Sequence, residues 1–215
     1  MVRYKYIVVI LILVANFAFA VGTQINPDPK MPKKEPRNKW GVGVIYSDKG
    51  YGIAGSYYAP ISNSSDFYLN LGITGVSDNR EFEFYDYYGN SYIDGKVNRV
   101  FLIPLNIGVQ HYMFKEDIES DFKPFVSIGA TPALVLTNPY DKAYFKAFGY
   151  FNSAFAMGGY VGAGFEYQQS KNIAFSLNLR YYYLPVVVGS VTSLVNNPMK
   201  DVGGIHMQFG VNFLK

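Results

Sequence analysis

The sequence has no cysteine, only two histidines and few charged residues. The absence of cysteine excludes disulfide bonds, thiolate metal sites and cysteine nucleophiles, and it also excludes an anchor in which lipid is attached to a cysteine. Charged residues make up 16% of the chain, whereas soluble domains average about 25%. The chain is therefore poor in the residues that normally cover a soluble surface.

Aromatic residues are abundant instead, at 18% of the chain, with 20 Tyr and 17 Phe. The 19 basic residues barely outnumber the 16 acidic ones, and two of the basic residues, Arg3 and Lys5, stand near the N-terminus. The charge of the remaining chain is close to balanced. The isoelectric point of 8.8 therefore gives no reason to expect a nucleic-acid partner.

The N-terminal segment has the pattern of a secretory signal peptide. Two positive charges precede the apolar run YIVVILILVANFAFA, which ends in a small-x-small sequence at Ala20. We predict a signal peptide at 1–20, a flexible proline-rich tail at 21–38 and a single domain at 39–215. An uncleaved membrane anchor is the alternative, although the run is short for a spanning helix, which needs about 20 apolar residues.

From residue 39 onward the sequence alternates between large apolar residues and small or polar ones, without a helical period. A period of two predicts strands with two unlike faces. In NIAFSLNLRYYYL, for example, Phe175 and Leu177 alternate with Ser176 and Asn178. Eight such segments occur, at about 39–47, 51–59, 66–76, 99–114, 122–136, 154–168, 172–184 and 203–214.

The direction of the large apolar face decides the class of protein. The interior of an eight-stranded barrel has room only for its own side chains, and the large residues of all eight segments would overfill it. The small face carries few Lys or Glu, unlike a soluble surface. We therefore predict an all-β fold, an eight-stranded antiparallel up-and-down transmembrane β-barrel with its apolar face toward lipid. A soluble ligand-binding barrel of lipocalin type, with the apolar face inward, is the alternative.

The connections agree with a barrel in an outer membrane. The links between segments two and three, four and five, and six and seven are short, whereas those at 77–98, 137–153 and 185–202 are long. Short periplasmic turns and long outer loops are typical of these barrels, as are aromatic girdles at the two interfaces. Residues near strand ends that fit such girdles are Trp40, Tyr57, Phe67, Phe101, Tyr167, Tyr181 and Tyr183. We predict localisation in the bacterial outer membrane, surrounded by lipid.

The stretches FKPFVSIGATPAL, GGYVGAGFEYQQSKNIAFSLNLRYYY and HMQFGVNFL resemble the small outer-membrane β-barrel family that includes OmpA-like and OmpX-like eight-stranded barrels. The resemblance covers 39–215. It implies architecture rather than activity, because members serve as adhesins, anchors or narrow pores. It also implies that the barrel-insertion machinery reads the C-terminal strand through a final aromatic residue. Phe213 fits that role, but Leu214 and Lys215 follow it, which departs from the family pattern.

Inward-facing polar residues form the candidate site. We predict a lumen polar network of Glu166, Arg180, Asn178, His206, Gln208, Gln110 and Asn70. Glu166 and Arg180 lie on neighbouring segments, and buried charges need partners. A tight turn near Ser170 would place Arg180 roughly opposite Tyr160 rather than Glu166, so direct contact between the two charges needs the long Arg side chain or the barrel stagger. The network either fills the lumen as a structural element or forms a constricted polar pathway.

No catalytic residue, metal or cofactor is predicted. A lipid-modifying barrel enzyme would need a histidine with a serine or carboxylate partner at the lipid-facing outer edge. His206 faces inward and His111 lies near a periplasmic turn, so neither fits. The glycines of GGYVGAG belong to a strand rather than to a phosphate-binding loop.

The long loops are the remaining functional surface. They contain REFEFYDYYGNSY, YDKAYFKAFGYFN and PVVVGSVTSLVNN, which are rich in aromatic or apolar residues. Either the strands continue past the membrane and these loops are their ends, or the loops bind a protein partner. We predict a non-enzymatic outer-membrane barrel with a structural or surface-interaction role through its extracellular loops. A small passive porin-like channel is the alternative.

Overall fold

The computed structural model describes residues 37–113, 121–142 and 149–215. The predicted signal peptide at 1–20 lies outside the described residues, as does all but the last two residues of the predicted tail at 21–38. Within the described part, no helix is long and apolar enough to cross a membrane.

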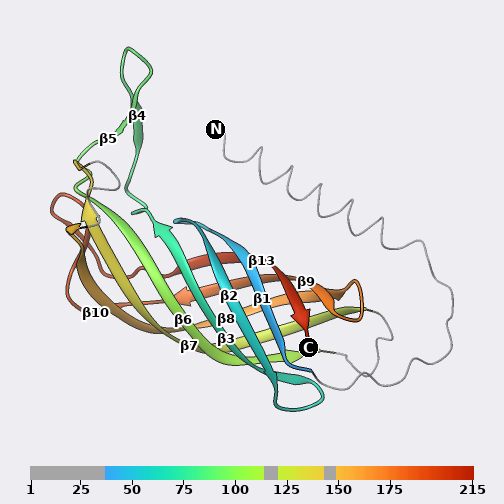
Figure 1. Cartoon of the computed structure of the whole chain (residues 1–215). Coiled ribbons are helices and arrows are strands. Elements are labelled where there is room, and N and C mark those ends of the chain that lie inside the picture. The colour runs from blue at the N-terminus through green and yellow to red at the C-terminus, as the bar shows by residue number, and fades with distance from the viewer. Residues whose placement is uncertain (1–36, 114–120, 143–148) are drawn as a thin grey trace. The chain divides into compact units, whose positions relative to one another are not determined.

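Eight long strands form a closed antiparallel barrel (Figure 1). They are β1 (Lys39–Ser47), β2 (Gly50–Pro60), β3 (Ser65–Val76), β6 (Asn98–Tyr112), β7 (Phe122–Pro139), β8 (Asn152–Gln168), β9 (Ile173–Tyr183) and β13 (Gly204–Leu214). The first strand pairs with the last along its full length, from Lys39 opposite Leu214 to Ser47 opposite His206, which closes the sheet. The predicted all-β, eight-stranded up-and-down barrel is confirmed, and each predicted segment coincides with one of these strands.

Burial alternates along the barrel strands, because successive side chains of a strand point to opposite faces. On β9, Leu179 is 53% exposed, whereas the adjacent Arg180 is 3% exposed. The outer wall is apolar over most strands, with exposed side chains that include Val42, Val44, Ile53, Leu71, Ile73, Ile128, Val161 and Ile205. At one rim Trp40 stacks on Phe213, with ring centroids 4.7 Å apart. The large apolar face therefore points outward as predicted, and the lipocalin-type alternative does not fit.

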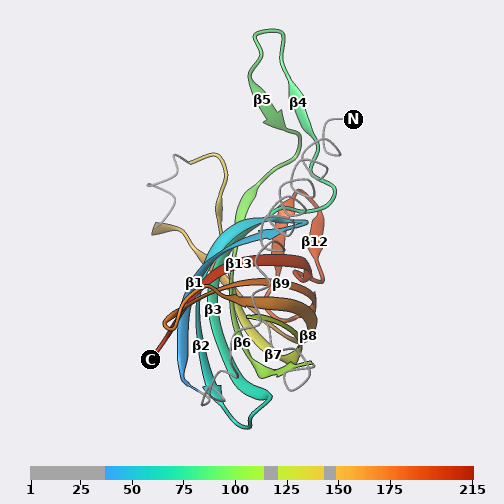
Figure 2. The same ribbon diagram turned by 90° about the vertical axis from the view of Figure 1, so that its right-hand side faces the viewer.

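The two ends of the barrel differ. At the end that we call the turn end, β2 leads into β3, β6 into β7 and β8 into β9. The opposite end, the loop end, carries five short strands in its long connections: β4 (Glu83–Tyr85), β5 (Ser91–Ile93), β10 (Val186–Val188), β11 (Val191–Leu194) and β12 (Asn197–Met199). The β4–β5 hairpin projects beyond the barrel (Figures 1 and 2). Strand β11 pairs with β12, and β10 pairs with β8.

Candidate functional site

A buried cluster of charged side chains occupies the lumen at the turn end. The Lys39 ammonium, at the start of β1, lies 2.9 Å from Glu166 Oε2 on β8 and 3.0 Å from Asp66 Oδ2 on β3. It also donates a hydrogen bond to the Tyr112 hydroxyl and lies 4.9 Å from the ring centroids of both Tyr58 and Tyr112. All three charged residues are buried, so the surrounding low dielectric strengthens their attraction.

The cluster contains two carboxylates and one lysine, so both acids depend on the same cation. Further hydrogen bonds come from the Tyr112 hydroxyl to Asp66, at 3.2 Å, and from the Asn212 amide to Glu166, at 3.3 Å. Of these residues only Glu166 belongs to the network predicted from sequence. Lys39, Asp66 and Tyr112 are missing from it because they lie at segment ends. Asp66 precedes Asn70 by four positions and Tyr112 follows Gln110 by two, so the same period of two also places these two residues on the inward face.

The second charged group in the lumen, Arg180 on β9, has no carboxylate partner among the described residues. Its Nη1 donates to Gln208 Oε1 at 3.1 Å, and its guanidinium lies 4.7 Å and 5.5 Å from the ring centroids of Tyr68 and Tyr160. These are distances for cation–π attraction. The remaining nitrogens, Nε and Nη2, lack a hydrogen-bond partner within the part of the chain that the structure describes. The structure therefore does not bring Glu166 and Arg180 together, although both face inward.

The other predicted residues are only partly connected. Asn70 accepts a hydrogen bond from the Asn106 amide at 2.8 Å, and its own amide nitrogen lies 3.5 Å from Gln208 Oε1. Gln110 donates to the Tyr112 hydroxyl at 2.9 Å and so joins the lysine cluster. Among the described residues, Asn178 has no hydrogen-bond partner for either amide atom.

His206 also stands apart from the hydrogen-bonded groups. Its ring packs against Tyr182, with centroids 4.6 Å apart. The seven predicted residues are all buried in the lumen. They form a turn-end group around Lys39 and a middle group around Arg180 and Asn70, rather than one continuous network.

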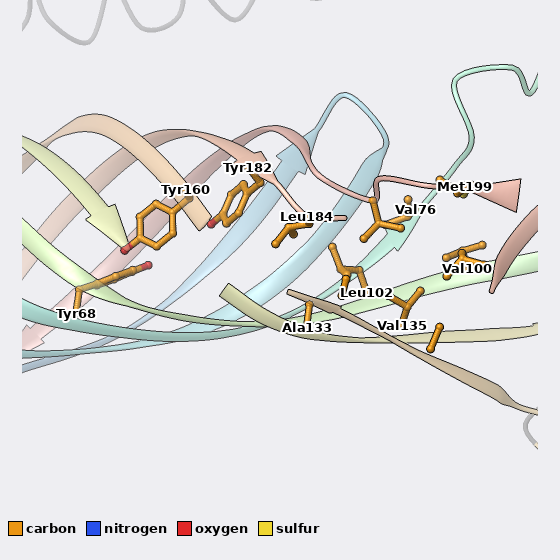
Figure 3. Packing of buried hydrophobic residues seen from close by; sticks show 14 of the residues in the cluster. Tyr68, Val76, Val100, Leu102, Ala133, Val135, Tyr160, Tyr182, Leu184 and Met199 are labelled. Carbon is orange, nitrogen blue, oxygen red and sulfur yellow. The ribbon is translucent and has the colours of Figure 1, made fainter. Parts of the chain in front are cut away.

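Apolar side chains fill the lumen between Arg180 and the loop end (Figure 3). Beyond the tyrosines the packed residues are Val76, Val100, Leu102, Ala133, Val135, Ala154, Ala156 and Leu184. Gly129 leaves the space for one of the tyrosines, since a Cβ there would come 2.7 Å from the Tyr160 ring. The polar lumen expected from sequence is therefore concentrated at the turn end and in the middle. The part nearer the loop end is a mainly apolar plug, which also buries Thr74, Thr137 and Asn138.

The β11–β12 hairpin covers this plug, and we call residues 191–199 the lid. Val191 and Ser193 are completely buried, and Met199 is nearly so. The segment 185–197 is therefore only in part the exposed loop expected from sequence: Val191 and Leu194 are buried at the barrel opening, whereas Val187, Val188 and Val195 are exposed. The long loop at 77–98 fixes the lid in place. Glu81 accepts a hydrogen bond from Ser193 and pairs with Lys96 Nζ at 2.6 Å.

A charged pair strengthens the same junction between loop and lid. Arg80 donates to Asn197 Oδ1 at 2.8 Å and forms a salt bridge to Asp78 at 2.6 Å. The hydrogen bonds from Arg80 lower the pKa of the Asp78 carboxyl. This carboxyl is consequently ionised at neutral pH and holds Arg80 toward the lid.

The β4–β5 hairpin presents aromatic side chains to solvent. At its tip Tyr87 and Tyr88 are 98% and 86% exposed. The Asp86 carboxylate fixes the tip by accepting hydrogen bonds from the backbone N–H groups of Tyr88, at 2.9 Å, and Asn90, at 2.8 Å. Gly89 has a φ of 83°, a conformation that favours glycine. The hydrogen bonds from Asn90 lower the pKa of the Asp86 carboxyl, which stays ionised.

A closed eight-stranded antiparallel barrel with an apolar outer wall is the fold of small outer-membrane barrels. Solved structures of this class are similar to the chain. Neisserial surface protein A shares 13% identity, with a TM-score of 0.53 over 82% of this chain and 94% of that one. A major outer membrane protein from Thermus thermophilus shares 11% identity, with a TM-score of 0.54 over 83% and 99%.

The N-terminal β-barrel domain of Pseudomonas aeruginosa OprF is also similar, at 13% identity and a TM-score of 0.51 over 85% of this chain and 100% of that domain. No family model and no curated protein matches the sequence. The likeness establishes the fold, an outer-membrane-type transmembrane β-barrel.

Proposed function

We propose that this chain is a non-enzymatic outer-membrane protein that interacts with a partner through the β4–β5 hairpin, on a barrel that stays closed. The observation that carries this proposal is the combination of a plugged lumen with a projecting hairpin. The plug and lid bury apolar side chains at the loop end, whereas the hairpin exposes aromatic ones such as Tyr87. Large exposed apolar groups on a rigid turn are typical of binding surfaces.

The proposal places the loop end outside the cell and the turn end in the periplasm. The lumen groups around Lys39 and Arg180 then have a structural role, because they join strands across the barrel interior. Recognition of β13 by the barrel-insertion machinery, through the outward-facing Phe213, belongs to the same proposal.

Adhesion and conductance test this function together. Cells that display the wild-type chain should adhere to some members of a panel of immobilised proteins and glycans. Cells that display a variant with 82–94 replaced by a short Gly-Ser link should not. The purified wild-type barrel should give no stable current in a planar lipid bilayer. Equal adhesion by both cell types would reject the surface role.

A small passive channel is the second candidate, and the polar turn-end half of the lumen favours it. This candidate needs the lid and plug to move, because Leu102 and Leu184 are completely buried in the path. Stable, ion-selective currents from the wild-type barrel would support the channel and contradict the closed-barrel proposal.

A further inference from the structure

We propose that the β4–β5 hairpin binds a cationic partner, namely a lysine- or arginine-rich segment of another protein. The inference rests on the proposed surface role and adds the chemistry of the partner. Three observations carry it. They are the charge of the hairpin, the arrangement of its aromatic rings, and the cations of this chain that already lie over other tyrosines at the loop end.

The hairpin is uniformly acidic. From Phe82 to Asp94 it carries three carboxylates, those of Glu83, Asp86 and Asp94, and no basic residue. All three acids are exposed. Their field repels phosphate and sulfate groups and attracts ammonium and guanidinium groups. An anionic lipid headgroup or sulfated glycan is therefore the wrong partner for this surface, and a basic protein segment is the matching one.

The rings of the hairpin are arranged so that cations can reach them. Phe84 and Tyr92 face each other across the two strands, with centroids 5.8 Å apart, and both stay about half exposed. Tyr87 and Tyr88 stand edge to face at the tip, with centroids 5.7 Å apart. An aromatic face attracts a Lys or Arg cation placed over it. The three carboxylates of the hairpin add Coulomb attraction to a cation that approaches these rings.

Other tyrosines at the loop end already hold cations of this chain. Lys142 Nζ lies 3.3 Å from the ring centroid of Tyr150. Arg99 and Lys96 lie 4.8 Å and 5.3 Å from the centroid of Tyr140. Within the described part of the chain, no basic residue stands over a ring of the hairpin. These rings therefore offer the same kind of contact to a cation from outside.

Binding of a model cationic peptide tests the inference. The mature chain is refolded into nanodiscs of zwitterionic phosphatidylcholine, so that lipid charge contributes nothing, and titrated against fluorescent decalysine at low salt. We expect saturable binding that weakens at least tenfold in Tyr87→Ala/Tyr88→Ala and in Glu83→Gln/Asp94→Asn. Asp86 is left in place because it fixes the tip. Retention of the heat-dependent gel shift shows that each variant is folded.

Two further measurements make the result specific. Tyr150→Ala removes an exposed tyrosine that already holds a lysine, so it should leave decalysine binding unchanged. Decaglutamate and maltoheptaose serve as anionic and neutral probes and should not bind. Absence of decalysine binding, equal binding of decaglutamate, or indifference to both hairpin double variants would overturn the inference. If hairpin replacement still abolished cell adhesion in that case, the proposed surface role would stand and only the cationic partner would be wrong.

Discussion

Replacing Lys39 with methionine should destabilise the barrel more than replacing Glu166 with glutamine, although the two side chains form one ion pair. The cluster contains one cation and two carboxylates, with the Lys39 ammonium 2.9 Å from Glu166 and 3.0 Å from Asp66. Lys39→Met leaves two buried carboxylates without a cation, and loss of one partner of a buried pair costs about 3–5 kcal/mol.

Glu166→Gln has a smaller effect because the pair between Lys39 and Asp66 survives and the excess negative charge disappears. The loss is then mainly that of hydrogen bonds to a charged group, about 1.5–3 kcal/mol. The double variant Lys39→Met/Glu166→Gln keeps only one uncompensated carboxylate, so it should be more stable than Lys39→Met alone.

Urea-dependent refolding into lipid vesicles measures these differences, with folded and unfolded chains separated by their gel mobility without boiling. The free energies of unfolding of the four proteins form a double-mutant cycle. A Glu166→Gln variant as unstable as Lys39→Met, or a double variant less stable than Lys39→Met, would contradict the assignment of Lys39 as the one cation that the described residues bring to the cluster.

The remaining predictions concern the wall, the lid and the lumen. Leu179→Arg should lower stability by about 2–4 kcal/mol, because it places a charge on the lipid face, whereas Leu179→Phe should be nearly neutral in the same refolding assay. The unboiled barrel should migrate differently from the boiled one on gels, and recovery as a soluble protein without such a shift would reject the membrane barrel. Glu81→Ala should free the lid and speed proteolysis within 191–199, without loss of the gel shift. Arg180→Ala with Tyr160→Ala should open the middle of the lumen and raise ion leak in bilayers above the wild-type level.

The barrel strands and their facing could be predicted because one local rule governs them. On β9, Leu177 and Leu179 point out and Asn178 and Arg180 point in, and this follows from the period of two alone. No partner has to be known for that assignment. The aromatic rim residues, such as Trp40, follow from the same rule together with their place near a strand end.

The contacts inside the lumen could not be predicted in the same way, because they depend on strand stagger and on side-chain reach. Lys39 and Glu166 are 127 positions apart, and nothing local links them. The register places Arg180 opposite Gly162 rather than Glu166, and the guanidinium lies among tyrosines, a set of contacts that the period of two does not specify. The lid cannot be predicted from sequence for a related reason. Val191 and Met199 are apolar residues of a loop, and their burial depends on the plug beneath them, which no local pattern indicates.

The position of Lys39 on the first barrel strand has a consequence for the order of assembly. Asp66 lies on β3, which only β2 separates from β1, whereas Glu166 lies on β8, on the other side of the seam between β1 and β13. Glu166 therefore reaches Lys39 only when β1 has joined β13, and before that step its carboxylate needs water or loses much of its hydration without compensation. We therefore expect the interior to stay hydrated while the hairpins of the wall insert, and the ion cluster to lose its water last, as the seam closes. Closure of the seam and pairing of Glu166 with its cation are then one event, which disfavours a dry but open intermediate.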